Sequence, residues 1–128
     1  MTDTFIIVRI KGRRLAIDPG EIVFLRAEGC NTRLFLDKNE EGILTTNPFI
    51  MLNAQLSGTV FLQCHKSCLV NSRKITAFDS KNRTIKVGKH VIQVSRRKSA
   101  HIFRHLSAMK IPDIELVVST SRKWPFFF

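Results

Sequence analysis

The fold is decided by the stretch FLQCHKSCLVN, residues 61–71. It begins with apolar residues typical of a β-strand, and Lys66 and Ser67 follow directly after that strand. This pattern predicts a short strand that ends in a basic, polar loop. Similar short apolar runs, separated by turn residues, continue on both sides of the stretch. They favour an antiparallel domain that is mainly β or mixed α and β.

Toward the N-terminus, apolar runs alternate with turn residues. Strands are predicted at residues 5–10, 15–17, 22–25 and 33–36. The sequence Asp18-Pro19-Gly20 predicts a turn in which Gly20 takes a positive φ. Residues 37–42 are expected to form a polar connection. A helix is predicted over 48–56, with Asn47 as its cap and Pro48 at its first position.

Toward the C-terminus, alternation over residues 75–94 predicts a β-meander with a tight turn at Gly88-Lys89. Ser95 stands where a helix cap is expected. The following helix should end before Pro112, and its apolar face is predicted to contain Ala100, Phe103 with Ile102, Leu106 and Met109.

The length of 128 residues suits one domain. We expect that domain to cover residues 1–112, with a core over about 13–106, followed by a tail over 113–128. Residues 114–118 could add a strand. The end of the tail, Trp124–Phe128, is aromatic and follows two basic residues. It could serve as a docking peptide, as a membrane-surface foot or as a clamp on the chain's own core.

Charge is distributed unevenly along the chain. Lys and Arg total 21 and Asp and Glu total 10, so the formal net charge is +11. Residues 1–60 contain seven basic and seven acidic side chains, whereas residues 61–128 contain fourteen and three. A basic half joined to a neutral half favours a polyanion such as nucleic acid as the partner. The alternative is a generally basic soluble protein.

Several classes of protein are excluded or disfavoured. No apolar run reaches the ~18–20 residues that a membrane span needs. The N-terminus lacks the basic and apolar regions of a secretory signal. Three Cys are too few for a disulfide scaffold and suit a reducing cytosol, so a cytoplasmic location is expected. The 44% of apolar residues argues against wholesale disorder.

Metal and catalytic sites are also disfavoured. Cys64, His65 and Cys68 could offer ligands, with Cys30 as a fourth, but zinc sites use paired knuckles and only one cluster is present. His101 and His105 share a helical face without an acidic partner nearby, so solvent or phosphate contact is favoured over metal. Phosphate-binding, dinucleotide-binding and nucleophile-elbow motifs are missing from the sequence. We therefore expect no enzyme activity, no cofactor and no metal.

Basic residues gather at three strand ends. Lys66 and Ser67 form the first group, Arg73 and Lys74 the second, and residues 95–98 the third. The third group comprises Ser95, Arg96, Arg97 and Lys98, at the N-terminus of the second predicted helix. A helix N-terminus attracts phosphate, and Arg can grip guanine with two donors. The alternative is a solvated basic rim. Three such groups in one small domain favour DNA binding.

These residues resemble the LytTR domain, the DNA-binding module of many bacterial response regulators. Residues 61–71, followed by Ile75, are similar to the family's pattern of Phe, a basic position, His, a polar residue, Ser, apolar residues and Asn. Ile92-Gln93-Val94-Ser95-Arg96-Arg97 resembles its second motif. Residues 22–25 with the loop 28–33 form a third, weaker mark. The resemblance covers about residues 13–106.

The resemblance implies an elongated fold, mainly β, of short antiparallel strands in small sheets with one or two short helices. It also implies that loops enter successive major grooves of double-stranded DNA. Lys66 and Arg96 fall at reader positions of the motifs, and a third contact falls at Thr32 with Asn31 and Arg33 beside it. Ser67, Arg73, Lys74, Ser95, Arg97 and Lys98 complete the expected DNA-binding set.

His65 and Asn71 are expected to be framework residues, because such side chains in tight loops often bond to the backbone. Three positions depart from the family pattern: Gln63 replaces Arg, Gln93 replaces Pro, and Thr32 replaces His or Tyr. These departures leave the base preference open.

The chain is expected to be a transcription regulator of the two-component type without its receiver, and its beginning at Met1 favours a stand-alone protein over an excised fragment. It could pair as a homodimer on direct repeats and take its signal from a separate partner. Two alternatives remain. One is a single-stranded DNA or RNA binder on a β surface, and the other is a protein-interaction module acting through the aromatic tail.

Overall fold

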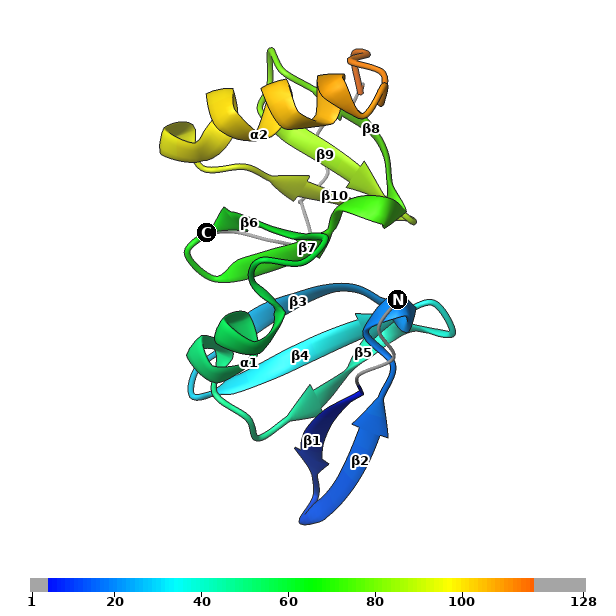
Figure 1. Ribbon diagram of the computed structural model, residues 1–128, viewed down its shortest axis with the longest axis vertical. Helices are drawn as coiled ribbons and strands as arrows, with labels where there is room; N and C mark the ends of the chain where they lie inside the picture. Colours follow the sequence, from blue (N-terminus) through cyan, green and yellow to red (C-terminus); the bar gives the residue numbers. More distant parts are fainter. Residues whose placement is uncertain (1–4, 117–128) are drawn as a thin grey trace.

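The computed structural model describes residues 5–116, which form an elongated molecule of three small sheets and two helices (Figure 1). The strands are β1 Ile6–Ile10, β2 Arg13–Ile17, β3 Ile22–Glu28, β4 Asn31–Leu36, β5 Asn39–Thr45, β6 Phe61–His65, β7 Cys68–Asn71, β8 Ile75–Asp79, β9 Thr84–Val87 and β10 His90–Gln93. The helices are α1 Phe49–Leu56 and α2 Arg96–Ala108, and two short 3-10 turns are η1 Pro19–Glu21 and η2 Ser72–Lys74. The expected fold class, mainly β with short antiparallel strands, is confirmed.

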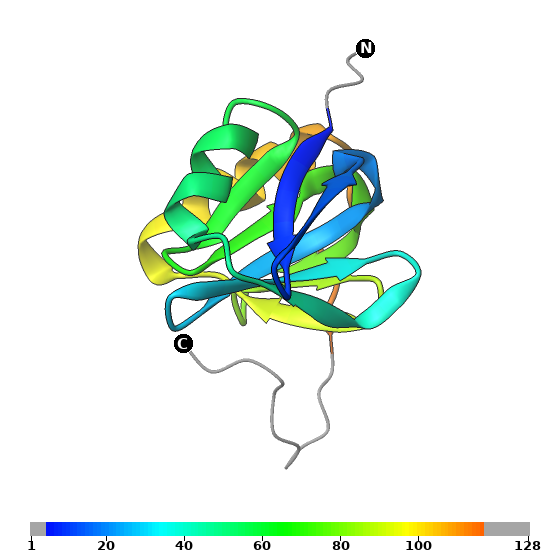
Figure 2. The same cartoon turned by 90° about the horizontal axis from the view of Figure 1, so that it is seen from below.

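The central layer is a five-stranded sheet in the order β5-β4-β3-β7-β6. Its lower face packs on the two-stranded sheet β1-β2 and on α1, which lie on the same side of the sheet (Figures 1 and 2). The core on this side is aliphatic and includes Val8, Leu25, Leu34 and Leu52, all fully buried. Because both faces of β3 are covered, its residues 22–25 form a continuous apolar run rather than an alternating one.

The upper face of the central sheet packs on the three-stranded sheet β10-β9-β8 and on α2. This second core contains two stacked pairs of aromatic rings among its aliphatic side chains. Phe24 and Phe35 stack with their centroids 4.2 Å apart, and Phe78 and Phe103 stack at 5.1 Å. The predicted meander over 75–94 is therefore present as β8, β9 and β10. It is held in place by aromatic packing on both of its sides.

Four local expectations are corrected. Residues 39–45 form the edge strand β5, which the sequence hid because most of its side chains are at least partly exposed and show no apolar alternation. Gly20 does not have a positive φ, because residues 19–21 wind into a 3-10 turn capped by Asp18. In α2, Ala100 and Met109 are exposed. The other predicted members of its apolar face, Ile102, Phe103 and Leu106, are buried as expected.

The fourth correction concerns Asn47. Its Oδ1 does not cap α1 but accepts a hydrogen bond from the backbone N–H of Arg9 at 2.8 Å. Pro48 occupies the cap position itself, without a side-chain hydrogen bond. Asn47 therefore ties the β1-β2 hairpin to the body of the protein.

The last described residues run beside β8. Asp113 forms a parallel bridge with Phe78, and its carboxylate accepts hydrogen bonds from the N–H and the hydroxyl of Ser80. The N–H of Leu116 donates to the carboxylate of Asp79. Of the strand expected over 114–118, only the first three residues are described. The aromatic segment Trp124–Phe128 also lies outside the described residues.

Candidate nucleic-acid interface

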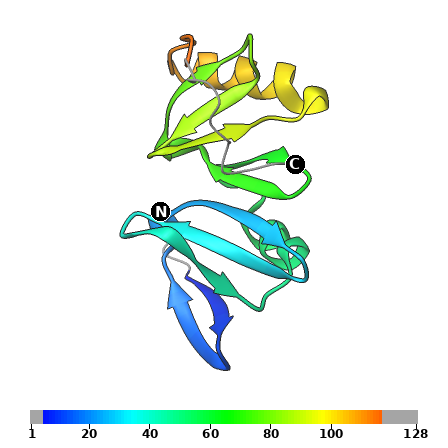
Figure 3. The same ribbon diagram turned by 180° about the vertical axis from the view of Figure 1, so that it is seen from behind.

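Three chain segments meet at one edge of the molecule, at the left of Figure 1 and the right of Figure 3. They are the β3-β4 turn region, the β6-β7 turn and the start of α2. Two backbone hydrogen bonds join them: the N–H of Ala27 donates to the carbonyl of Ser67 at 2.9 Å, and the N–H of Ser95 donates to the carbonyl of Cys64 at 2.9 Å. Residues 26–33, 65–67 and 95–98 are called the basic edge below.

The basic edge carries six basic side chains and one carboxylate. The basic residues are Arg26, Arg33, Lys66, Arg96, Arg97 and Lys98, and the carboxylate is Glu28. Such a concentration of positive charge attracts a polyanion and speeds its association. The Lys66 and Ser95 groups, which are separate in the sequence, therefore lie at one edge of the molecule.

The β6-β7 turn presents Lys66 to solvent. Lys66 and Ser67 are the two residues of a tight hairpin turn, in which Lys66 is exposed and Ser67 is half-buried. His65 supports the turn, since its Nδ1 accepts a hydrogen bond from the N–H of Ser67 at 3.3 Å. Partial burial lowers the pKa of His65, and the neighbouring charge of Lys66 lowers it further. The lowered pKa favours the neutral imidazole, and an Nδ1 that accepts this hydrogen bond must be unprotonated.

The start of α2 combines exposed arginines with free backbone donors. Ser95 caps the helix as predicted, accepting a hydrogen bond from the N–H of Lys98 at 3.3 Å. Arg96 and Arg97 are exposed, whereas Lys98 is half-buried. Helix N-termini carry positive potential, and no acidic residue stands in the first turn of α2 to neutralise it. This end of the helix can hold an anion.

The β3-β4 turn corrects one of the expected contacts. Thr32 is fully buried, and its hydroxyl donates to the carbonyl of Asn47 at 2.8 Å, so its side chain is not available to DNA. Thr32 belongs to β4, where alternation points it into the lower core. Asn31 is half-buried at the start of the strand. The exposed tip of the turn is Gly29 and Cys30, which lie within the expected loop 28–33 but were not among the expected contacts, and Gly29 has a positive φ.

Arg33 is engaged within the protein. Glu28 accepts hydrogen bonds from Arg33 Nε at 2.8 Å and from Arg26 Nη2 at 2.6 Å. These hydrogen bonds, that of Arg33 first, lower the pKa of Glu28 although burial opposes the shift. Two guanidinium groups share one carboxylate, so the network keeps a net positive charge. Arg26 also lies 5.3 Å from the ring centroid of Phe35.

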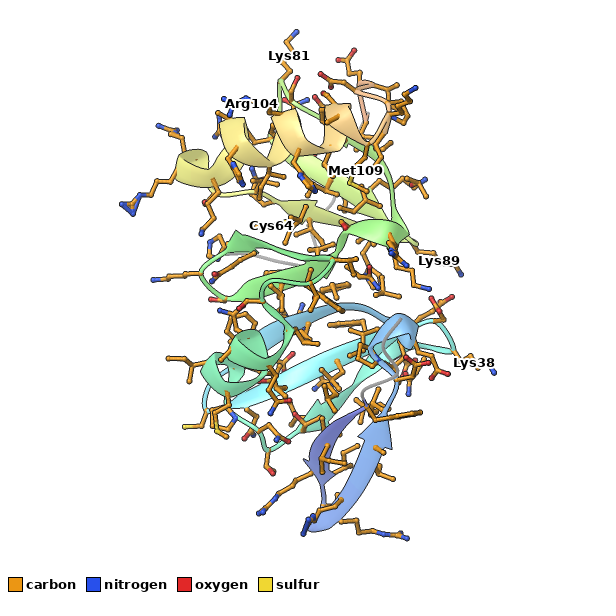
Figure 4. All side chains as sticks on the ribbon, viewed as in Figure 1. Lys38, Cys64, Lys81, Lys89, Arg104 and Met109 are labelled. Atoms are coloured by element: carbon orange, nitrogen blue, oxygen red, sulfur yellow. The ribbon has the colours of Figure 1, made fainter. Side chains whose placement is uncertain are left out.

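Arg73 and Lys74, the second of the three expected basic groups, lie away from the basic edge. They belong to η2, which follows the end of β7 farthest from the Lys66 turn. Lys74 Nζ pairs with Asp37 Oδ2 at 2.7 Å, beside the β4-β5 connection. Figure 4 places Lys38 and Lys89 on this opposite side of the molecule. The four residues of β7 separate the Lys66 turn from η2 by about 10 Å.

The expectation that His65 and Asn71 are framework residues agrees with their contacts. Asn71 is only 2% exposed. Its Nδ2 donates to the carbonyl of Ile22 at 2.9 Å, and its Oδ1 accepts from the N–H of Arg73 at 3.0 Å. Asn71 thus ties β7 to β3 and starts η2. It holds the sheet that carries the basic edge.

The cysteines do not form a metal centre with other residues of the described chain. Cys64 and Cys68 are buried and Cys30 is exposed. Burial raises the pKa of the Cys64 thiol to about 12 and raises that of Cys68 as well, so both stay protonated at neutral pH. Among residues 5–116, no group of three or more His, Cys, Asp and Glu side chains could hold a metal ion. No helix within that range is long and apolar enough to cross a membrane.

Comparisons with known proteins agree on one family. The model of the LytTr DNA-binding domain matches residues 12–107. A solved LytTr DNA-binding domain from Bacillus cereus superposes with a TM-score of 0.62, covering 83% of this chain and 98% of that one. At 18% identity the likeness concerns the fold alone. No curated protein matches the chain. The family match spans three quarters of the sequence and includes all three segments of the basic edge, and the chain belongs to the LytTr DNA-binding domain family.

Proposed function

We propose that the protein is a sequence-specific, double-stranded DNA-binding regulator of transcription that uses the basic edge as its DNA-binding surface. One observation carries this proposal above the others. The two backbone hydrogen bonds at Ser67 and Ser95 bring three separate turns to the same edge of a long, narrow molecule. Three turns that protrude along one edge can follow the major groove of DNA, each turn entering a successive stretch of that groove.

The residues of the basic edge divide into two roles. Lys66 and Arg96 are the proposed base readers, because both are exposed and both stand on rigid supports, a two-residue turn and a capped helix end. Arg97, Lys98, Ser67 and Ser95 are the proposed phosphate contacts. Phosphate contacts position a protein on the duplex, and contacts with base edges in the major groove supply the sequence information.

The β3-β4 turn is the proposed third contact. With Thr32 buried, the turn would approach DNA through Asn31 and its exposed neighbours. The Glu28 network would fix Arg33 and Arg26 at the base of the turn. These two arginines would then add positive electrostatic potential and hold the turn in place, because their guanidinium groups are already bonded to Glu28.

A salt titration tests the ligand class. If about six phosphates are neutralised, the logarithm of the binding constant should fall with the logarithm of salt concentration at a slope near −5. A slope near zero would refute a mechanism based on phosphate neutralisation. A competing single-stranded DNA of the same sequence should displace the duplex poorly. Efficient displacement would favour the single-strand alternative.

Neighbouring arginines test the division of roles. Arg96→Ala should lose about 1–3 kcal/mol of discrimination at one base position. Arg97→Ala removes the same side chain one residue further along α2 and should weaken random and selected duplexes alike. Equal losses on both duplexes for Arg96→Ala would remove its assignment as a reader.

Selection of bound sites from random duplex DNA would supply the target. Direct repeats about one helical turn apart would support paired binding of two copies. In a two-component setting, the activating signal would come from a separate partner.

A further inference from the structure

We propose that the β1-β2 hairpin is a second DNA-contacting arm, which binds the phosphate backbone beyond the basic edge. This inference rests on the proposed function. It concerns a part of the chain that belongs to the half with balanced charge, and the motifs for DNA binding lie elsewhere.

The hairpin gathers positive charge without compensation. Its basic residues are Arg9, Lys11, Arg13 and Arg14, all of them exposed. No acidic residue occurs between Phe5 and Ile17. Among the described residues, none of these four side chains takes part in an ion pair. The seven acidic residues that balance the first half include six between Asp18 and Glu41, on other elements.

Two of these positive charges lie close enough to destabilise the hairpin. Arg9 and Arg14 are direct cross-strand partners. Like charges in this position destabilise a strand pair. At the tip, Lys11 has a φ of 53° and Gly12 a φ of 80°, the positive values of a tight two-residue turn that favours Asn-Gly. An anionic ligand would offset the repulsion between the two arginines.

The hairpin is held firmly enough to act as an arm. Its inner face buries Ile6 and Val8 in the lower core. The backbone of Arg9 makes two contacts with the body: its N–H donates to Asn47 Oδ1 at 2.8 Å, and its carbonyl accepts from the N–H of Thr46 at 2.9 Å. Binding would therefore require little ordering of the backbone, which keeps its entropic cost low.

Its position suits an extension of the DNA contact. The hairpin tip forms the end of the long axis opposite α2 (Figure 1). The basic edge runs along the same axis. Five residues of strand span about 17 Å, which is about half a helical turn of DNA. Phosphates flanking the site read by the loops are the polyanion that the proposed function already brings to this molecule.

The test is a triple variant that removes charge and preserves the hairpin. Arg9→Thr and Arg14→Thr remove the repelling pair and place residues that favour strands, while Lys11→Asn suits the positive φ of the turn. We expect the unfolding midpoint in urea to stay the same or rise. The matched control is Lys81→Gln/Arg104→Gln/Lys110→Asn, which removes three charges. Lys81 and Arg104 lie at the opposite end of the molecule (Figure 4), and Lys110 has a φ of 65° that Asn tolerates.

The assay compares both variants with the wild type on a duplex that the wild type has selected. Loss of two to three phosphate contacts reduces the magnitude of the salt slope by about 2–3, equivalent to about a 60- to 500-fold weaker binding constant at 0.1 M salt. Hydroxyl-radical footprinting should show protection lost at one end of the site only. The control variant should keep the wild-type salt slope and footprint, with only a small decrease in the binding constant that is the same for all duplexes.

Three outcomes would overturn the inference. In the first, the hairpin variant matches the control while Arg97→Ala still weakens binding, so the hairpin assignment fails and the proposed function stands. In the second, the wild type itself binds duplex without a salt slope, and both fail. In the third, the wild type but not the hairpin variant sediments with phosphatidylserine vesicles while their DNA binding is equal, which assigns the arm to a membrane surface.

Discussion

Replacing Asn71 with Ala separates a framework role from a reading role inside the motif 61–71. Asn71→Ala removes two hydrogen bonds, one to the carbonyl of Ile22 and one from the N–H of Arg73. Ile22 is fully buried, so its carbonyl loses a partner that water cannot easily replace. Leaving a buried polar group unsatisfied costs about 1–3 kcal/mol. The N–H of exposed Arg73 can turn to water, which adds about 0.5–1 kcal/mol.

These contributions amount to about 1.5–4 kcal/mol of the free energy of unfolding, a large part of the roughly 5–15 kcal/mol typical of a domain. With a urea m-value of about 1.5 kcal/mol/M, within the usual range, the unfolding midpoint should fall by about 1–3 M. Equilibrium unfolding in urea, followed by circular dichroism, measures this shift. The matched control is Asn53→Ala, which removes the same side chain from α1, where its Oδ1 accepts no hydrogen bond from the described residues and Ala is the better helix former, so the cost should stay below about 1 kcal/mol.

The DNA-binding result completes the test. At low temperature, where the variant is still folded, Asn71→Ala should keep the wild-type salt slope and base preference. A midpoint shift below about 0.5 M, or a changed base preference with unchanged stability, would refute the argument. Asn71 would then have to be placed among the readers.

Three further predictions concern stability. Ser95→Ala should cost about 1 kcal/mol in thermal or urea unfolding, because the N–H of Lys98 loses its cap; no change would mean that the cap contributes nothing. Gly42→Ala should cost roughly 1–3 kcal/mol, since φ is +84° and the new Cβ would lie 2.7 Å from Cγ of Arg33, and a neutral effect would show that Arg33 moves aside freely. Burial lowers the pKa of His90 below its unfolded value, so the unfolded chain binds more protons and stability should fall as pH drops below about 6.5. His90→Phe should reduce this fall between pH 7.5 and 5.5, and an unchanged pH dependence would exclude His90 as its source.

The parts of the fold that the sequence predicted are those determined by local chemistry. Gly88-Lys89 sets a two-residue turn, Ser95 caps α2, and the apolar alternation over 75–94 forms the meander. Strand β5 was missed because an exposed edge strand needs only backbone hydrogen bonds to its neighbour. Asn47 was misassigned for a similar reason: its partner, Arg9, is 38 residues away.

For the candidate site, too, the sequence predicted the local structures but not the long-range contacts between them. The motifs located the Lys66 turn and the Ser95 helix start, because both are local turn and cap structures. Their juxtaposition came from the pairing of β6 with β7 and from the contact of Ser95 with Cys64, which no local pattern encodes. Thr32 was expected at the surface because the resemblance placed a contact there and the strand was predicted to begin at Arg33, whereas β4 begins at Asn31. In a strand, a shift of one residue moves a side chain from solvent to core.

Antiparallel pairing also explains why charge counted along the sequence misassigns surfaces. Lys66 and Lys74 are eight positions apart, but β7 carries the chain back across the sheet between them, so the two lysines face different partners. The first half shows the converse. Its charges cancel in the count, yet the hairpin holds four basic residues and the β3-β5 region holds most of the acids. A formal charge of zero over sixty residues is therefore compatible with a strongly basic arm. Only the strand register shows which charges share a face, and in this protein it indicates two basic surfaces, the basic edge and the hairpin tip.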